Sequence, residues 1–326
     1  MPYSHHSHSG QFCPGHARDR LEEVVEAALS KRMQVLALTE HMPRHDDDRY
    51  PEEVEAGMTF ASYHLENERA YFEEAERLRE KYQGRIDLLV GFEGEWIRPQ
   101  ESADLVRRSL DVYRPDFFIG SVHHVHTIPI DYDGEMYGRA RQVAGGTDER
   151  LFEDYFDSQA DMLRSLRPPV VGHFDLIRLK SDDPDGSFVA MKGVWERILN
   201  NLDYIASYGG VLEINTASLR KGLDEPYPKA EICQAALERK IRFCLSDDSH
   251  GCDQVATNYS RVLPFLDKAG ISQLTYLKRG AGSSVPSSSP PSSNTGVVLE
   301  DKRFPNLCFE TVKVKDIRHH PFWTCL

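Results

Sequence analysis

Histidines and carboxylates recur in short clusters along this 326-residue sequence. The clusters are His6 and His8 with His16 beyond them, Glu40-His41, Glu93 with Glu95, His123-His124 with His126, His173, and Asp247-Asp248 with His250. Neutral imidazole suits zinc, iron and manganese, and a carboxylate can bridge two metals. At least nine candidate ligands are present, too many for one tetrahedral zinc site. The clusters therefore predict a site for two or three divalent metals.

The spacing within two clusters supports this interpretation. His6 and His8 are two residues apart, so on an extended segment both rings point to one side. Asp248 and His250 repeat that spacing. A single His-x-His pair is also common on ordinary surfaces. The prediction therefore depends on whether the fold brings the clusters together.

Short apolar runs alternate with longer amphipathic patterns along most of the chain. The runs predict strands buried on both faces at 34–38, 86–92, 116–122, 170–172, 210–214 and 241–245, after a short first strand near 3–6. Helices are predicted at 18–30, 63–82, 149–165, 190–207, 229–238 and 260–268. This alternation is typical of parallel α/β architecture. About seven β/α units favour a closed or nearly closed barrel, with an open doubly wound sheet as the alternative.

The clusters fall where six of the seven predicted strands end. In α/β barrels the carboxyl ends of the strands converge on the active site. Ligands that are far apart in the sequence would therefore meet in space. This coincidence is the strongest evidence for a metal site that the residues alone provide.

Composition and segment character set the domain organisation. We expect one α/β domain over residues 1–280, a Ser/Pro-rich loop or linker over 281–296, and a C-terminal tail over 297–326 that packs on the barrel. An alternating stretch around residues 308–314 has the pattern of an edge strand without a clear place. The net charge of -13 disfavours nucleic acid and anionic membranes as partners. Six scattered cysteines, no apolar run of membrane-spanning length and no secretory signal predict a cytoplasmic protein.

The motifs resemble those of the polymerase and histidinol phosphatase (PHP) superfamily. The superfamily resemblance rests on His6-Ser7-His8, Leu38-Thr39-Glu40-His41, Gly91-Phe92-Glu93, Gly120-Ser121-Val122-His123, Gly172-His173 and Ser246-Asp247-Asp248-Ser249-His250. The histidinol-phosphatase branch of fungi and some bacteria is indicated by His6-Ser7-His8-Ser9-Gly10, Glu40-His41-Met42-Pro43-Arg44, Gly172-His173-Phe174-Asp175-Leu176-Ile177-Arg178 and Glu213-Ile214-Asn215-Thr216-Ala217. The resemblance covers about residues 1–280.

This resemblance implies a distorted (β/α)7 TIM-like barrel with a trinuclear metal site at the carboxyl ends of the strands. The metals would be zinc, iron or manganese. One would take His6, His8, Glu93 and Asp248; a second would take Glu93, His123 and His173, with Glu93 bridging; a third would take His16, His41 and His250.

The reaction implied is hydrolysis of L-histidinol phosphate to L-histidinol and phosphate in histidine biosynthesis. A metal-bridging hydroxide would attack phosphorus, with Glu93 and Asp248 in the catalytic set. Arg178 and Arg220 follow strand ends and are expected to hold the phosphoryl oxygens, with Arg44 as a further candidate. The substrate ammonium is expected to contact either Glu95 or Asp175. The acid that protonates the leaving group is left open among Asp247, His124 and His126.

Three other functions are compatible with parts of this pattern. A different PHP phosphoesterase would act on another small phosphate ester, a nucleotide or an oligonucleotide, although the chain lacks basic stripes for nucleic acid. An amidohydrolase-like barrel also uses His-x-His, but no lysine stands at a fitting strand end for carbamylation. A metal-storing or scaffold protein would bind metal without turnover and would not need the arginines.

Overall fold

The computed structural model describes residues 2–280 and 301–324, so the predicted linker at 281–296 lies outside the described residues. Two parallel sheets form the centre of the molecule. The first has the order β1-β2-β3, with β1 (Tyr3–Ser4), β2 (Val35–Leu38) and β3 (Asp87–Val90). The second has the order β10-β9-β8-β5-β4, with β10 (Arg242–Ser246), β9 (Val211–Asn215), β8 (Val170–Val171), β5 (Ile119–Ser121) and β4 (Glu93–Glu95). All seven predicted strand regions are therefore confirmed as parallel strands.

The two sheets contact each other along both edges. At one edge the His5 amide donates to the carbonyl of Leu245 over 3.2 Å, which places β1 beside β10. At the other edge β3 continues into β4 after two residues, and the Asp116 amide donates to the Val90 carbonyl over 2.8 Å. The strands are almost wholly buried, as expected for parallel strands covered on both faces.

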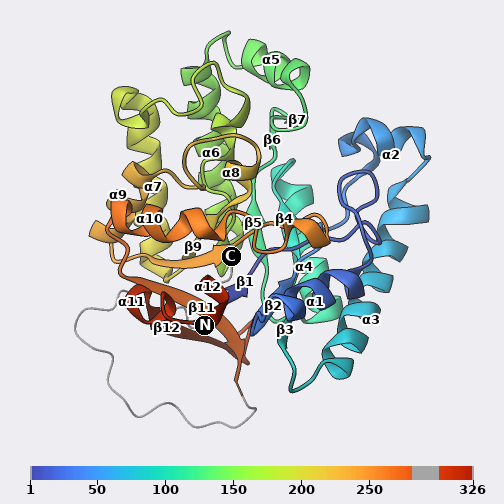
Figure 1. Ribbon diagram of the computed structural model, residues 1–326. Coiled ribbons are helices and arrows are strands. Elements are labelled where there is room, and N and C mark those ends of the chain that lie inside the picture. The colour runs from blue at the N-terminus through green and yellow to red at the C-terminus, as the bar shows by residue number, and fades with distance from the viewer. Residues whose placement is uncertain (1, 281–300, 325–326) are drawn as a thin grey trace.

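Helices cover the outside of the strands, with α1, α3 and α4 on one side and α6, α7 and α9 on the other (Figure 1). Their bounds are α1 (Leu21–Ser30), α3 (Leu65–Lys81), α4 (Pro99–Tyr113), α6 (Asp148–Leu166), α7 (Lys192–Tyr208), α9 (Ala230–Glu238) and α10 (Tyr259–Ala269). In α1 the side chains of Leu21, Val24, Val25 and Ala28 are buried, which is the apolar face that their spacing creates. The six predicted helices are confirmed, whereas α4 was not predicted.

Shorter elements follow the carboxyl ends of the strands. They are the 3-10 turns η1 (Asp46–Asp48), η3 (Leu176–Lys180), η4 (Phe188–Ala190) and η5 (Cys252–Gln254), the π-helical turn η2 (Phe60–His64), the helices α2 (Pro51–Glu55), α5 (Gly134–Val143) and α8 (Ala217–Arg220), and the hairpin of β6 (His124–Val125) with β7 (Ile128–Pro129).

The C-terminal part of the chain adds an antiparallel pair of strands at the opposite end of the molecule (Figure 1). β12 (Leu307–Lys313) pairs with β11 (Gln273–Arg279). The alternating stretch predicted around residues 308–314 therefore forms a strand beside β11. The short helices α11 (Val314–Ile317) and α12 (Pro321–Thr324) follow. Their buried side chains include those of Phe322 and Trp323, and Tyr259 stacks on Trp323. The boundaries proposed for the linker and tail stay a prediction.

Within the described residues, the helices are all too short or too polar to cross a lipid bilayer.

Candidate metal centre

Eight of the nine predicted metal ligands come together at the carboxyl ends of the parallel strands. Each follows or begins a strand, so the parallel arrangement brings them to the same end of the sheets. They are His6 and His8 after β1, His41 after β2, Glu93 at the start of β4, His123 after β5, His173 after β8, and Asp248 and His250 after β10.

Two of the three groups consist of residues that the expected ligand sets also contain. Ligand atoms of His6, His8 and Asp248 lie within 4.8 Å of one another, and so do those of Glu93, His123 and His173. Glu93 stands between the two groups. Its Oε2 is 3.3 Å from His6 Nε2, and its Oε1 is 2.9 Å from His173 Nε2. The two oxygens of one carboxylate thus face two different groups, which is the arrangement a bridging ligand requires.

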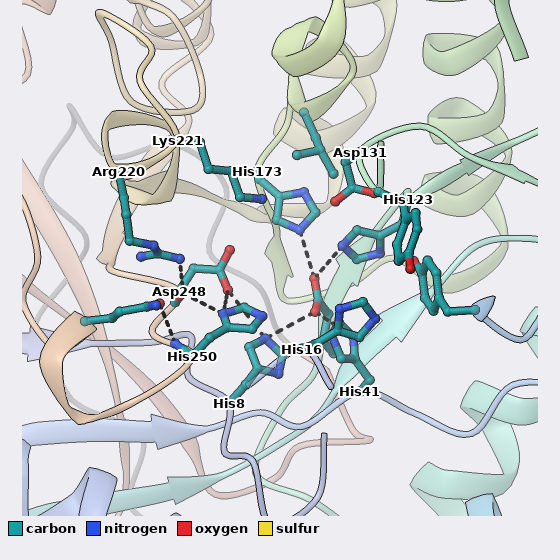
Figure 2. Close-up of a pocket in the computed structure, with 15 residues that line it drawn as sticks. His8, His16, His41, His123, Asp131, His173, Arg220, Lys221, Asp248 and His250 are labelled. Atoms are coloured by element: carbon teal, nitrogen blue, oxygen red, sulfur yellow. Dashed lines mark hydrogen bonds and ion pairs between the residues drawn. The ribbon is translucent and has the colours of Figure 1, made fainter. Parts of the chain in front are cut away.

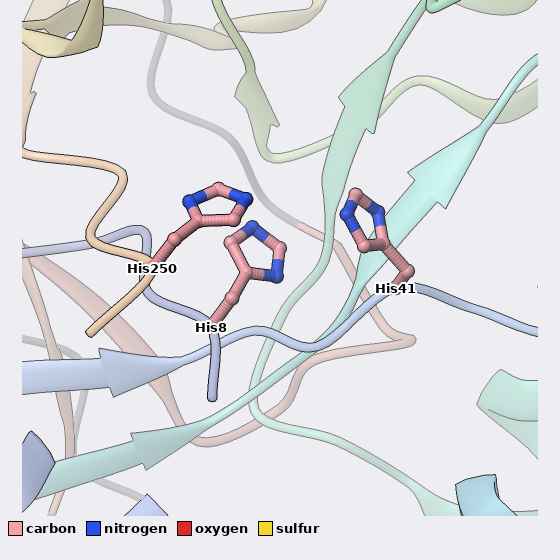
Figure 3. A group of neighbouring side chains, drawn as sticks. All are labelled: His8, His41 and His250. Atoms are coloured by element: carbon pink, nitrogen blue, oxygen red, sulfur yellow. The ribbon is translucent and has the colours of Figure 1, made fainter. Parts of the chain in front are cut away.

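The third group differs from the expected one. His8 lies with His41 and His250 in this group (Figure 3), where the resemblance placed His16. The His8 ring lies 4.4 Å from the ring of His41 and 4.5 Å from that of His250, between centroids. His16 lines the same cavity, but its Nε2 lies 3.0 Å from Glu52 Oε1 on α2. His16 could therefore bind a metal only if its Nε2 gave up the contact with Glu52.

The electrostatics of these residues fit divalent cations. The Nε2 atoms of His6 and His8 are buried and have no hydrogen-bond partner. Burial opposes ionisation of Glu93, but His6, His123 and His41 hold its pKa well below the usual range. Burial also lowers the pKa of His123 to about 4, which leaves its imidazole neutral at neutral pH. Burial acts in the same direction on His6 and His41, but nearby carboxylates outweigh it and raise their pKa values, so a metal would have to displace a proton from these two rings. Ionised carboxylates and neutral imidazoles are the donors that zinc, iron and manganese take.

A second layer of residues orients these ligands. Glu213, on β9, has Oε1 2.8 Å from His6 Nδ1, and its Oε2 accepts a hydrogen bond from the His173 amide over 2.7 Å. Ser246 donates to Glu213 Oε1 over 2.5 Å. A carboxylate on the far nitrogen of a ligating imidazole fixes its tautomer and ring orientation. The sequence analysis named Glu213 only within a family motif, because Glu213 belongs to none of the clusters of histidines and carboxylates.

Glu95 and Arg44, two predicted substrate-binding residues, contact each other beneath the site. Arg44 donates to Glu95 Oε1 over 2.7 Å and to Glu53 over 2.6 Å, and both Arg44 and Glu95 are buried. The same Glu95 oxygen lies 3.0 Å from His41 Nδ1. Neither Glu95 nor Arg44 lines the cavity. Their contacts orient His41 and anchor α2. Neither side chain faces the cavity in which a substrate would bind.

The two arginines predicted to hold phosphate lie in different surroundings. Arg220 lines the cavity, and it donates to the carbonyls of Asp247 and Asp248 over 3.1 and 3.0 Å. Arg178 is 1% exposed and does not line the cavity. Its five N–H groups donate to Asp175, Asp185 and the carbonyls of residues 184, 225 and 226. A phosphate could reach Arg178 only if several of these bonds were exchanged.

The remaining predicted acids do not reach the cavity. Asp175 is fully buried and accepts from Arg178 and from the Lys229 amide. Asp247 is fully buried and accepts from Ser4 and from two backbone amides. His126 pairs with Asp154 on the surface, and His124 packs near the Tyr50 ring. None of these side chains lines the cavity, so the leaving-group acid stays open.

The cavity over the metal-capable residues has a volume of about 370 Å³ (Figure 2). Besides the predicted residues, its lining includes Tyr50, Asp131, Tyr132, Leu176, Lys221 and Gln254, which the sequence analysis missed. Most of them belong to turns and short helices after the strands. Their positions depend on loop paths that hydrophobic periodicity does not encode. Lys221 alone carried a usable signal, since it follows Arg220 directly.

Fold and site together define a metal-dependent hydrolase with metal-capable residues at the carboxyl ends of parallel strands in an α/β fold. The profile of the PHP domain family matches residues 4–217, and the chain belongs to this family.

Relatives cover most of the chain. It is 43% identical over 288 residues to a protein of Schizosaccharomyces pombe named probable histidinol-phosphatase, covering 86% of this chain and 90% of that one. It is 32% identical to the histidinol-phosphatase of Saccharomyces cerevisiae, with 84% and 90% covered.

Solved structures agree on the fold. The hisK protein of Listeria monocytogenes has a TM-score of 0.65 at 25% identity, covering 79% of this chain and 99% of that one. The histidinol phosphate phosphatase of Lactococcus lactis, solved with zinc, L-histidinol and phosphate, has a TM-score of 0.63 at 21% identity, covering 84% and 95%.

Proposed function

We propose that this protein is a histidinol-phosphatase, a metal-dependent phosphoric monoester hydrolase that converts L-histidinol phosphate to L-histidinol and phosphate. The observation that carries the proposal is the position of Glu93. Its two oxygens face two buried groups of metal-capable residues on the floor of a cavity that Arg220 and Lys221 also line. The names of the two fungal relatives support this substrate.

The finer architecture belongs to the same proposal. Counting β3 and β4 as one strand, seven parallel strands follow one another around the molecule, and hydrogen bonds join the sheets at both edges. This arrangement supports a distorted (β/α)7 TIM-like barrel. Three groups of ligand atoms support two to three divalent metals, which we take to be zinc, iron or manganese.

Residues on the floor and on the rim of the cavity have different roles in the proposed hydrolysis of phosphate esters. When bound, the metals would lower the pKa of a water molecule and neutralise charge on the phosphoryl oxygens. Glu93 and Asp248 belong to the catalytic set because they supply the anionic ligands between the histidines. Arg220 is fixed by two backbone carbonyls, which aims a planar, permanently charged donor group at the cavity. Fixed donors near the phosphoryl group stabilise charge without reorganising during the reaction.

The proposed partner is a small phosphate ester in the cytoplasm. A cavity of about 370 Å³ is within the usual range for small-molecule sites. The five described cysteines are all unpaired, as expected in a reducing compartment. The alternative is a PHP phosphoesterase that acts on a nucleotide or another small ester. The net charge of -13 weighs against nucleic acid as a partner.

Steady-state kinetics on L-histidinol phosphate, set against a panel of nucleotides, tests this proposal. The same preparation should be assayed before and after chelation, with elemental analysis of its metals. We expect preferential turnover of L-histidinol phosphate, two to three metals per chain, and loss of activity on chelation that a divalent metal restores. An active preparation with one metal or none would overturn the proposed centre. Preference for a nucleotide would favour the alternative.

A further inference from the structure

The cavity over the metal-capable residues has charge of opposite sign on its two sides (Figure 2). Arg220 and Lys221 project from one side, at the end of α8. Asp131 projects from the other side, above His123 and His173. A substrate with an anion at one end and a cation at the other would therefore enter in one favoured orientation.

Asp131 lies on a segment of backbone that is fixed on both sides. The residue before it, Ile130, is fully buried, and its amide donates to the His123 carbonyl over 2.9 Å. Two residues later the Asp133 side chain caps α5 by accepting from the Met136 amide over 2.7 Å. The backbone at Asp131 is thus anchored on both sides. Among the described residues, no hydrogen bond or ion pair is formed by the Asp131 carboxylate.

Two tyrosines line the cavity beside Asp131. The rings of Tyr50 and Tyr132 stack at 5.6 Å with an angle of 24° between their planes. The Tyr132 hydroxyl donates to Glu52 over 2.9 Å, and the other Glu52 oxygen lies 3.0 Å from His16. Glu52 is therefore already engaged, whereas Asp131 is not. An unpaired carboxylate next to aromatic rings is a suitable environment for an ammonium group attached to a flat ring.

We propose that Asp131 is the specificity residue that binds the primary ammonium group of the substrate, with Tyr50 and Tyr132 beside its imidazole ring. This inference rests on the proposed function and deepens it. It replaces Glu95 and Asp175 in this role, because both are buried outside the cavity and already paired. Asp131 then sets which phosphate esters are accepted, and the metal-capable residues do the chemistry.

The test compares two substrates that differ only in the amine. They are L-histidinol phosphate and 3-(imidazol-4-yl)propyl phosphate, which lacks the amine. Asp131→Asn keeps the size and removes the charge. We expect kcat/KM for L-histidinol phosphate to fall about ten- to a hundredfold, in line with the loss of a charge-assisted hydrogen bond. Turnover of the analogue should change little, and inhibition by L-histidinol should weaken in parallel.

Asp133→Asn is the matched control. It removes the same charge from the same loop, lies outside the cavity lining, and keeps an oxygen able to cap α5. It should leave the preference for the amine intact. An equal loss on both substrates in Asp131→Asn would overturn the proposal, since a leaving-group acid or a purely structural residue would act that way. No loss on either substrate would also overturn it. Absence of wild-type turnover on L-histidinol phosphate would instead remove the proposed function, and this subsite with it.

Discussion

At the scale of single residues, the position of Glu93 decides how the site can work. Both of its oxygens lie within 3.5 Å of histidine nitrogens from two different groups. It is 1% exposed, so its charge is balanced by neighbouring protein groups, and would be balanced by a bound metal, instead of by water. A change that keeps its shape but removes its charge should therefore affect two groups together.

Glu93→Gln tests this coupling. We expect activity to fall by at least about a hundredfold, because a bridging ligand loses one of its two anionic oxygens. Metal content should fall by more than one equivalent per chain, as measured by elemental analysis of the same sample. Glu101→Gln, an exposed change on α4, is the control and should alter neither value. Near-normal turnover with full metal content in Glu93→Gln would rule out a bridging role.

Arg220 and Arg178 offer a second test at this scale. Arg220→Lys should lower kcat/KM by about 2 kcal/mol, roughly thirtyfold, because a point charge replaces a fixed pair of donors. Inorganic phosphate should also inhibit this variant more weakly. Arg178→Lys should mainly lower the free energy of unfolding, by about 2 kcal/mol or more, because buried acceptors lose their partners.

Kinetics and urea unfolding on both variants separate these outcomes. Metal content serves as the control and should match the wild type. Loss of kcat/KM in Arg178→Lys at unchanged stability would show that Arg178 contacts phosphate, as the sequence predicts.

At the scale of secondary structure, the sequence was informative where burial fixes periodicity. The seven strand regions were predictable because parallel strands are apolar on both faces. The metal-capable residues were predictable because they directly follow those strands. α4 was missed because its apolar positions are interrupted by charges such as Asp104 and Arg107, which are exposed on the surface of the helix. Asp131 and Tyr132 were missed because a tight hairpin, and not a strand end, brings them to the cavity.

Some contacts between a helix and the strand ends depend on side-chain hydrogen bonds, which the hydrophobic pattern of the sequence does not reveal. Tyr71 on α3 is 2% exposed, and its hydroxyl lies 2.7 Å from the carbonyls of both Leu38 and Gly91. The Leu38 carbonyl ends β2 and the Gly91 carbonyl directly follows β3, close to His41 and Glu93 in the sequence. The hydroxyl therefore links two strand ends that support the metal centre.

Tyr71→Phe should cost about 1 kcal/mol of unfolding free energy, because the Gly91 carbonyl loses a buried donor. Urea denaturation measures this loss. Tyr63→Phe is the matched control, since the Tyr63 hydroxyl has no hydrogen-bond partner in the described part of the chain. We expect that variant to stay within about 0.5 kcal/mol of the wild type. Equal stability of Tyr71→Phe and the wild type would mean that water or a backbone shift replaces this hydroxyl.

At the scale of the whole molecule, the first and last parts of the chain pack against each other. The Tyr3 hydroxyl donates to the Thr275 carbonyl over 3.0 Å, and the Leu277 amide donates to His5 Nε2 over 2.9 Å. β11 thus lies against the segment that carries His6 and His8. Because β12 pairs along the full length of β11, the residues after 300 support the strand that contacts the start of the metal centre.

This arrangement changes what we expect from removing the tail. On sequence grounds alone, residues 283–295 contain too little apolar material to support a fold, so limited proteolysis should cut the chain there first. The structure adds that β12, α11 and α12 bury Val314, Ile317, Phe322 and Trp323 against the body of the protein. Cleavage and deletion should therefore have different effects.

A protease site introduced at residues 288–289 separates the two effects. After cleavage we expect both fragments to coelute in size-exclusion chromatography and the activity to persist, because the β11–β12 pairing and the buried side chains remain. A chain that ends at residue 280 should instead lose several kcal/mol of stability, because each large buried apolar side chain contributes about 1.5–3 kcal/mol. It should express poorly and bind less metal. A stable, fully active chain ending at residue 280 would show that the tail only covers the body, and that His6 and His8 need no support from β11 and β12.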